Sequence, residues 1–161
     1  MKRQACSDNR KRFPGSVASM GYHAFEECPA QIKETEGGVI YYEKWAIDYE
    51  DDIAAVVLRD GTVGIAAKAF RNCSSLTSIT IPDSVIGIAS DAFFGCNGLT
   101  SITIPDSVTS IGNTVFAGCT GLTSVTFNGT IDEWNAIGKS IFWYVSCPFS
   151  EVVCSDGTVN V

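Results

Sequence analysis

The chain of 161 residues has no long apolar run, only one histidine and no pair of cysteines in a CxxC arrangement. A membrane-spanning helix needs about 18 consecutive apolar residues, so none is predicted. The single histidine, His23, excludes a metal site or proton relay built from two histidines. Phosphate-binding glycine loops, GxSxG elbows and DNA-reading helices are also missing from the sequence. We therefore expect that the protein is not an enzyme and that it has no metal and no cofactor.

Charge is distributed unevenly along the chain. The net charge is -7, yet five of the eleven basic residues lie within residues 1–12. The remaining residues carry 17 acids and 6 bases, a net charge of -11. Such an acidic body disfavours a nucleic-acid partner, because phosphate backbones bind Lys and Arg. We expect residues 1–12 to be a basic, disordered terminus, and no signal peptide, because no apolar stretch follows them.

A 23-residue unit occurs three times without a gap, at residues 60–82, 83–105 and 106–128. The first two copies are identical at 14 of 23 positions and the last two at 12. A fixed period of this length is typical of solenoids, whose units bury their apolar faces against one another. Each unit contains the strand pattern LxxLxL, as in Leu76-Thr-Ser-Ile79-Thr-Ile81. The sequence therefore predicts a leucine-rich-repeat solenoid, mostly β with short helical turns.

The positions that keep the same apolar residue or cysteine in every copy are the predicted core. In each strand the isoleucines point inward and the threonine outward, and Pro82 and Pro105 end their strands. An Ala-Phe pair in the return segment suits a short helical turn whose phenylalanine fills the core. The predicted core columns are Phe70, Phe93, Phe116, Cys73, Cys96, Cys119, Leu76, Leu99 and Leu122.

The flanking segments depart from the period but complete a single predicted domain, residues 13–161. Residues 15–36 read as a partial repeat. Residues 37–59 read as a β insertion, whose strands at 39–42, 45–47 and 53–58 form an antiparallel hairpin or meander. Residues 129–161 read as a C-terminal cap, with a helix beginning at Thr130 and a closing hairpin around Asp156-Gly157.

The repeat AFxxC…LTSITIPDSVxxI resembles the BspA-type leucine-rich repeat, which occurs in surface proteins of gut and oral bacteria and of some parasitic protists. The resemblance is close over residues 60–128 and partial over residues 15–32. The tail TFNGTIDEWNAIGKS is similar to the ending that often follows such repeats. The resemblance implies a right-handed, curved parallel sheet, protein binding or adhesion without catalysis, and a secreted or cell-surface location.

Four of the seven cysteines follow the repeat. The column holds Cys73, Cys96, Cys119 and, in the partial copy, Cys28. Neighbouring strands lie about 4.8 Å apart, which permits disulfides, but equivalent side chains point the same way rather than toward each other. We therefore expect free, buried thiols in this column. Cys147 and Cys154, in the cap, are the better candidates for a disulfide.

Two further features have an ordinary structural interpretation. His23 aligns with Lys68, Asp91 and Thr114, a polar column that we expect to face solvent. The acidic run at residues 48–52 offers carboxylates for Ca²⁺, but it lacks the spacing and the glycine of an EF-hand loop, so a solvated turn is expected.

The outward strand positions form rows of small hydroxyls on a sheet that could serve as an extended binding surface. Such hydroxyls also satisfy solvent without a partner, so both interpretations stay open. The rows lack the Trp, Tyr and Arg typical of binding hot spots, which draws attention to aromatic residues in the insertion, or to Trp134, Trp143 and Tyr144 in the cap. The candidate face comprises Thr77, Ser78, Thr80, Thr100, Ser101, Thr103, Thr123, Ser124 and Thr126, and the candidate aromatic contacts are Tyr41, Tyr42, Trp45 and Tyr49.

Two functional hypotheses follow from the sequence. The first is a non-catalytic module that binds a protein or cell-surface ligand, with no nucleic-acid partner. The alternative is a structural scaffold, or a terminal fragment of a larger repeat protein, that has no ligand of its own. A hydrolase or carbohydrate-binding activity is disfavoured, because it needs paired carboxylates in a cleft and an open solenoid offers few.

Overall fold

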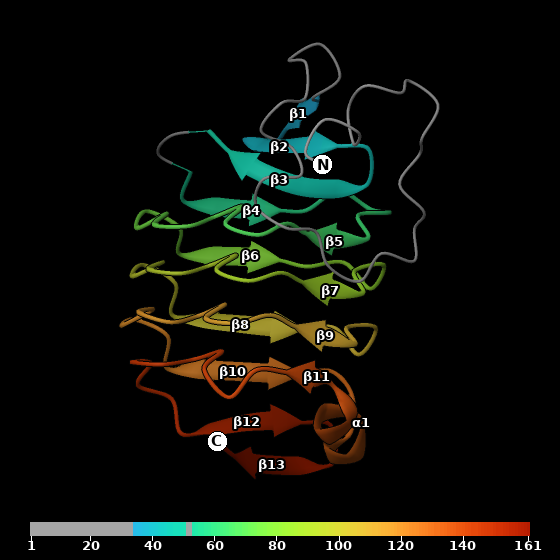
Figure 1. Cartoon of the computed structure of the whole chain (residues 1–161), viewed down its shortest axis with the longest axis vertical. Coiled ribbons are helices and arrows are strands. Elements are labelled where there is room, and N and C mark those ends of the chain that lie inside the picture. The colour runs from blue at the N-terminus through green and yellow to red at the C-terminus, as the bar shows by residue number, and fades with distance from the viewer. Residues whose placement is uncertain (1–33, 51–52) are drawn as a thin grey trace, which may run out of the picture.

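The chain winds into a solenoid whose coils stack along one axis, and each coil gives one strand to each of two stacks (Figure 1). The computed structural model describes residues 34–50 and 53–161. One stack is a seven-stranded sheet in the order β1-β2-β3-β5-β7-β9-β11. The other consists of a two-stranded sheet, β4-β6, followed by a four-stranded sheet, β13-β12-β10-β8. The solenoid that the repeat predicts is therefore confirmed.

The stack that carries the LxxLxL pattern alternates buried and exposed residues. Its parallel strands are β4 (Ala55–Val57), β6 (Ser78–Thr80), β8 (Ser101–Ile104), β10 (Ser124–Phe127) and β12 (Glu151–Cys154). Equivalent residues of successive coils are paired, as Ile102 is with Val125. Because side chains alternate across a strand, Ile102 is buried while Ser101 and Thr103 are exposed.

The second stack uses two-residue strands from β5 onward. Its parallel members are β3 (Trp45–Tyr49), β5 (Gly64–Ile65), β7 (Gly87–Ile88), β9 (Ser110–Ile111) and β11 (Gly138–Lys139). Ile65, Ile88 and Ile111 are buried, so this side of each coil closes the core. A Cβ atom on Gly64 would lie 2.4 Å from the ring of Trp45, which explains why this position has no side chain.

A chain of hydrogen-bonded turns, rather than a helix, links the two strands of each coil. In the first full repeat, the backbone nitrogen of Cys73 donates to the carbonyl oxygen of Phe70. The residue before the cysteine of each full repeat has a positive φ, at 62° for Asn72, 72° for Gly95 and 75° for Gly118. Glycine adopts this conformation freely and asparagine tolerates it better than most residues, which suits both to this place in the three full repeats.

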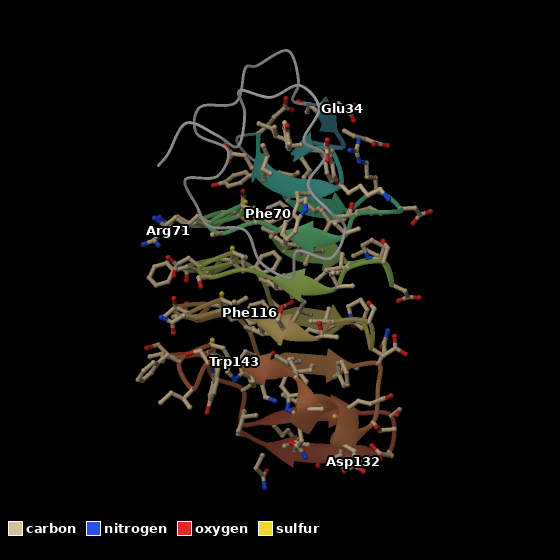
Figure 2. All side chains as sticks on the ribbon, turned by 45° about the vertical axis from the view of Figure 1, so that its right-hand side comes forward. Glu34, Phe70, Arg71, Phe116, Asp132 and Trp143 are labelled. Carbon is tan, nitrogen blue, oxygen red and sulfur yellow. The ribbon has the colours of Figure 1, made fainter. Side chains whose placement is uncertain are left out.

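The phenylalanine column forms an aromatic ladder along the solenoid axis. Ring centroids of Phe70 and Phe93, and of Phe93 and Phe116, lie 5.4 Å apart with interplanar angles of 6° and 5°. Tyr49 continues the ladder at the N-terminal side, and Trp143 closes it edge-on at the C-terminal side. Figure 2 shows Phe70, Phe116 and Trp143 following one another along the molecule. The leucine and cysteine columns are likewise buried beside this ladder.

The N-terminal part of the described chain combines a meander with a coil of the solenoid. Strands β1 (Glu34–Glu36), β2 (Val39–Tyr42) and β3 are antiparallel, which confirms the predicted hairpin. The assignment of residues 53–58 to the same meander was wrong, because β4 pairs in parallel with β6. Val56 aligns with Ile79 and is buried, so this segment is a further rung of the LxxLxL stack. Residues 15–33 of the predicted partial repeat, with His23 and Cys28, lie outside the described residues.

The C-terminal cap has the predicted elements. Helix α1 (Ile131–Ala136) begins with a capping box, in which the Thr130 side chain accepts from the backbone nitrogen of Glu133 and the Glu133 carboxylate accepts from the backbone nitrogen of Thr130. Trp134 and Ile137 are buried. Strand β12 extends the parallel stack, and β13 (Gly157–Asn160) folds back antiparallel to it as the closing hairpin.

Candidate binding surface

The outward positions of the LxxLxL strands form a row that crosses five coils. Its members are Val57, Thr80, Thr103, Thr126 and Val153. Thr80 and Thr103 are exposed and Thr126 is half-buried. Within residues 34–50 and 53–161, the hydroxyls of these three threonines make no hydrogen bond to the protein. They are therefore available to water or to a partner.

A second row lies two residues earlier on the same strands and has the same character. Ser78, Ser101 and Ser124 are all exposed. Ser101 pairs with Ser124, just as Thr103 pairs with Thr126. Together the two rows present neighbouring hydroxyls on one face of the sheet.

The third predicted row, Thr77, Thr100 and Thr123, has a different role. The Thr77 hydroxyl donates to the carbonyl oxygen of Ala54 at 2.9 Å, and the Thr123 hydroxyl donates to that of Thr100 at 3.3 Å. These hydroxyls join one coil to the next where the backbone turns into the strand. Because their donors are already occupied, these two residues contribute less to a partner than the rows beside them.

The face is neutral at its centre and acidic at one border. No charged residue lies at its outward positions on β6, β8 or β10. An exposed aspartate lies a few residues after β4, β6 and β8, at Asp60, Asp83 and Asp106. A partner that covers the face therefore meets hydroxyls in the middle and negative charge beyond the ends of the strands.

Three of the four aromatic contact candidates lie in the core rather than on the surface. Tyr41, Tyr42 and Trp45 are buried, and the Tyr41 ring is also covered by the guanidinium of Arg59 at 4.2 Å. Tyr49 is half-buried with its ring stacked on Phe70. These rings cover the core on the N-terminal side of the first full repeat. Because they are buried there, they are poor candidates for surface contacts with a partner.

The five cysteines of the described chain are free, and those of the repeat column form a ladder of thiols. The Sγ atoms of Cys96 and Cys119 donate to the carbonyl oxygens of Phe70 and Phe93, both at 3.0 Å. Cys147 adds another rung, since its thiol donates to Phe116 at 2.9 Å. Cys147 and Cys154 are also free, so the structure has no disulfide between them. The sequence did not predict that Cys147 belongs to this ladder, because it follows Cys119 by 28 residues rather than 23.

The two thiols of the cap, Cys147 and Cys154, have raised pKa values. Burial raises the pKa of the Cys147 thiol to about 12, and burial likewise raises the pKa of Cys154. Such thiols remain protonated near neutral pH, whereas a nucleophile or a metal ligand must be a thiolate. Within the described ranges, no three His, Cys, Asp or Glu side chains converge in a group that could hold a metal ion.

The exposed apolar residues of the cap were not identified from the sequence. Ile141, Phe142 and Val145 are exposed, while their neighbour Trp143 is buried. Sequence alone does not distinguish these residues, because the run from Ile141 to Val145 is continuously apolar. In the part of the chain that is described, no helix is long and apolar enough to cross a membrane.

Comparison with known proteins agrees with this geometry. The BspA type leucine rich repeat region matches residues 46–160 as six copies, so it begins within β3 and includes β4. A leucine-rich repeat protein from Eubacterium ventriosum is 26% identical with a TM-score of 0.57, over 68% of this chain and 32% of that one. One from Bacteroides ovatus is 23% identical with a TM-score of 0.51, over 75% of this chain and 34% of that one, and supports the fold alone. No curated protein matches the chain.

Proposed function

This chain belongs to the BspA-type leucine-rich repeat family, and from that premise we propose that it is a non-catalytic module that binds a protein or cell-surface ligand. The proposed contact is the outward face of β6, β8 and β10. The observation that carries the proposal is the pair of exposed hydroxyl rows, whose donors and acceptors are not used within the described chain. Solenoids commonly bind through such an extended face. A secreted or cell-surface location accords with the family resemblance.

The face favours a particular kind of partner. Hydroxyls donate and accept hydrogen bonds without charge, so the centre of the face suits a polar, uncharged surface. The aspartates beyond the strand ends favour a partner that carries Lys or Arg at that border. The buried insertion aromatics leave the hydroxyl rows, rather than Tyr41 or Trp45, as the proposed contact on this side of the molecule.

The test places a lysine at the centre of the face. A partner is first isolated by pull-down from bacterial or host surface extracts, purified, and its affinity measured. Thr103→Lys is expected to weaken binding by about tenfold or more, because a long charged side chain then occupies the middle coil. Asn135→Lys, an exposed position on α1, makes the same chemical change away from the face and should bind like the unmodified chain. Equal affinities for all three proteins would show that the face is not the contact.

A structural scaffold is the second candidate. The chain spans about a third of the length of the solved structures that it matches, so its coils would serve as one part of a longer array. A native reading frame with additional 23-residue copies would favour this role. A stable, monomeric 161-residue chain with a specific ligand would argue against it.

A further inference from the structure

Half of the strongly exposed large apolar residues in the described chain lie in one five-residue stretch of the cap, residues 141–145. They are Ile141, Phe142 and Val145, with exposed fractions of 80%, 53% and 46%. We call these three residues the cap patch. Soluble chains often expose single apolar side chains, but a group of them in one place marks an interaction site.

Comparison with the preceding coil shows that the cap patch is a change from the repeat. Backbone hydrogen bonds align the cap with that coil: Phe116 donates to Trp143 where Phe93 donates to Val115, and Gly118 donates to Val145 where Gly95 donates to Ala117. Counting along the chain, Ile141 and Phe142 then take the places of Asn113 and Thr114. Two polar positions have therefore become large and apolar in the cap alone.

The core does not require these side chains. The end of the core is closed by Trp134, Trp143 and Phe149, which are buried and whose rings contact one another. The ring of Phe142 takes no part in this cluster, although it lies next to Trp143 in the chain. Closing the solenoid therefore explains the buried aromatics but leaves the cap patch without a role.

The cap patch is also uncharged. Residues 140–150 contain no acid and no base, and the same is true of the adjacent Asn113, Thr114 and Ala117. Other surfaces carry acids, among them Glu34 and Glu36 at β1 and Asp132 on α1. With a net charge of -7, two copies of this chain repel each other through faces that carry acids, and residues 140–150 add nothing to that repulsion.

We propose that the cap patch is a self-complementary contact that pairs two copies of this chain about a two-fold axis. In such a contact the same residues face each other, so Phe142 of each copy packs on Ile141 and Val145 of the other. An uncharged apolar patch lacks the Lys and Arg that attract an anionic membrane, and it has no group that pairs with a charged partner. It can pack on the same apolar residues of a second copy. The proposal does not depend on the hydroxyl face, which lies on the strands and not in the cap loop.

The size of the patch sets the strength of the contact. A stable interface has about 20 to 30 residues on each side, and three apolar residues form only the centre of a much smaller one. The dimer should therefore be weak, with a dissociation constant on the order of 100 µM. Association is then visible only at high protein concentration.

Sedimentation velocity of the full chain, in reducing buffer from about 10 µM to about 1 mM, tests the proposal. The average mass should rise toward that of a dimer. Phe142→Asp and Val145→Asp should weaken association at least tenfold. Asn135→Asp is the control for the added charge, because Asn135 is exposed on α1 and lies outside the cap patch, and it should associate normally. Near-ultraviolet circular dichroism verifies that each variant retains its folded tryptophan environment.

Two results would overturn the proposal. A monomer at every concentration excludes the dimer, and association that Phe142→Asp leaves unchanged places the contact elsewhere. Co-sedimentation with phosphatidylcholine vesicles separates a second copy from a lipid surface. Vesicle binding that Phe142→Asp abolishes, by a chain that stays monomeric, would assign the patch to lipid and contradict the proposal.

Discussion

Replacing Phe93 with alanine removes the middle ring of the aromatic ladder. Phe93 is fully buried, and its ring lies 5.4 Å from both Phe70 and Phe116. Truncating a buried phenylalanine costs about 3–5 kcal/mol, and this figure includes the loss of ring contacts worth about 0.5–1.5 kcal/mol each. We expect Phe93→Ala to lower the free energy of unfolding by about 4 kcal/mol, a large part of the 5–15 kcal/mol typical of a domain.

Urea unfolding followed by tryptophan fluorescence measures this loss. Trp134 and Trp143 are buried in the cap and Trp45 is buried in β3, so tryptophan emission reports on both ends of the described coils, while far-ultraviolet circular dichroism reports on the strands. Coincidence of the two curves shows that the coils unfold together, which a free energy requires.

Phe142→Ala is the matched control, because the same side chain is removed from an exposed position. It should change the free energy of unfolding by less than about 0.5 kcal/mol. A loss below about 1 kcal/mol for Phe93→Ala, or equal losses for both variants, would refute the account of the ladder.

Three further changes test separate parts of the fold. Thr130→Ala removes the α1 cap and should cost about 1 kcal/mol by urea unfolding, whereas Thr109→Ala, outside any helix, should cost less. Gly64→Ala places a methyl group 2.4 Å from the Trp45 ring and should cost about 1–3 kcal/mol, and an unchanged melting temperature would contradict the close approach. Burial raises the pKa of Cys147 from the ordinary value of 9.0 to about 12 in the folded chain. Above pH 9 the thiol therefore loses its proton in the unfolded chain but keeps it in the folded chain, so the stability of the fold should fall as the pH rises above 9. The fall between about pH 8 and pH 10 should be smaller in Cys147→Ala, and parallel pH profiles would exclude the effect.

The repeat predicted the core because identical side chains recur at one spacing. Phe70, Phe93 and Phe116 must occupy equivalent places if the coils stack, and they do so as near-parallel rings. The same logic predicted that Ser101 and Thr103 point outward on β8. Local rules were enough for α1, since Thr130 and Glu133 form a capping box within one turn.

The rung formed by β4 was missed because its side chains keep only part of the pattern. Val56 and Leu58 occupy the inward positions that Ile79 and Ile81 have in the next coil. The outward threonine is replaced by Val57, and the preceding acidic segment suggested a turn between antiparallel strands. The inward positions of β4 only need to be apolar, so they need not repeat the isoleucines of the next coil. The pairing of β4 with β6 in the structure is what identifies β4 as a rung.

By itself the sequence determined the stacking period, the inward columns and the outward hydroxyl rows, because each depends on neighbours that repeat every 23 residues. Only the tertiary structure decided which residues close the core and which face solvent where the period ends. Tyr41 and Trp45 are covered, whereas Phe142 is exposed beside the buried Trp143. The physical reason is that, outside the periodic coils, the burial of a residue depends on which segments fold over the core. The sequence has no repeat there from which that arrangement could be predicted.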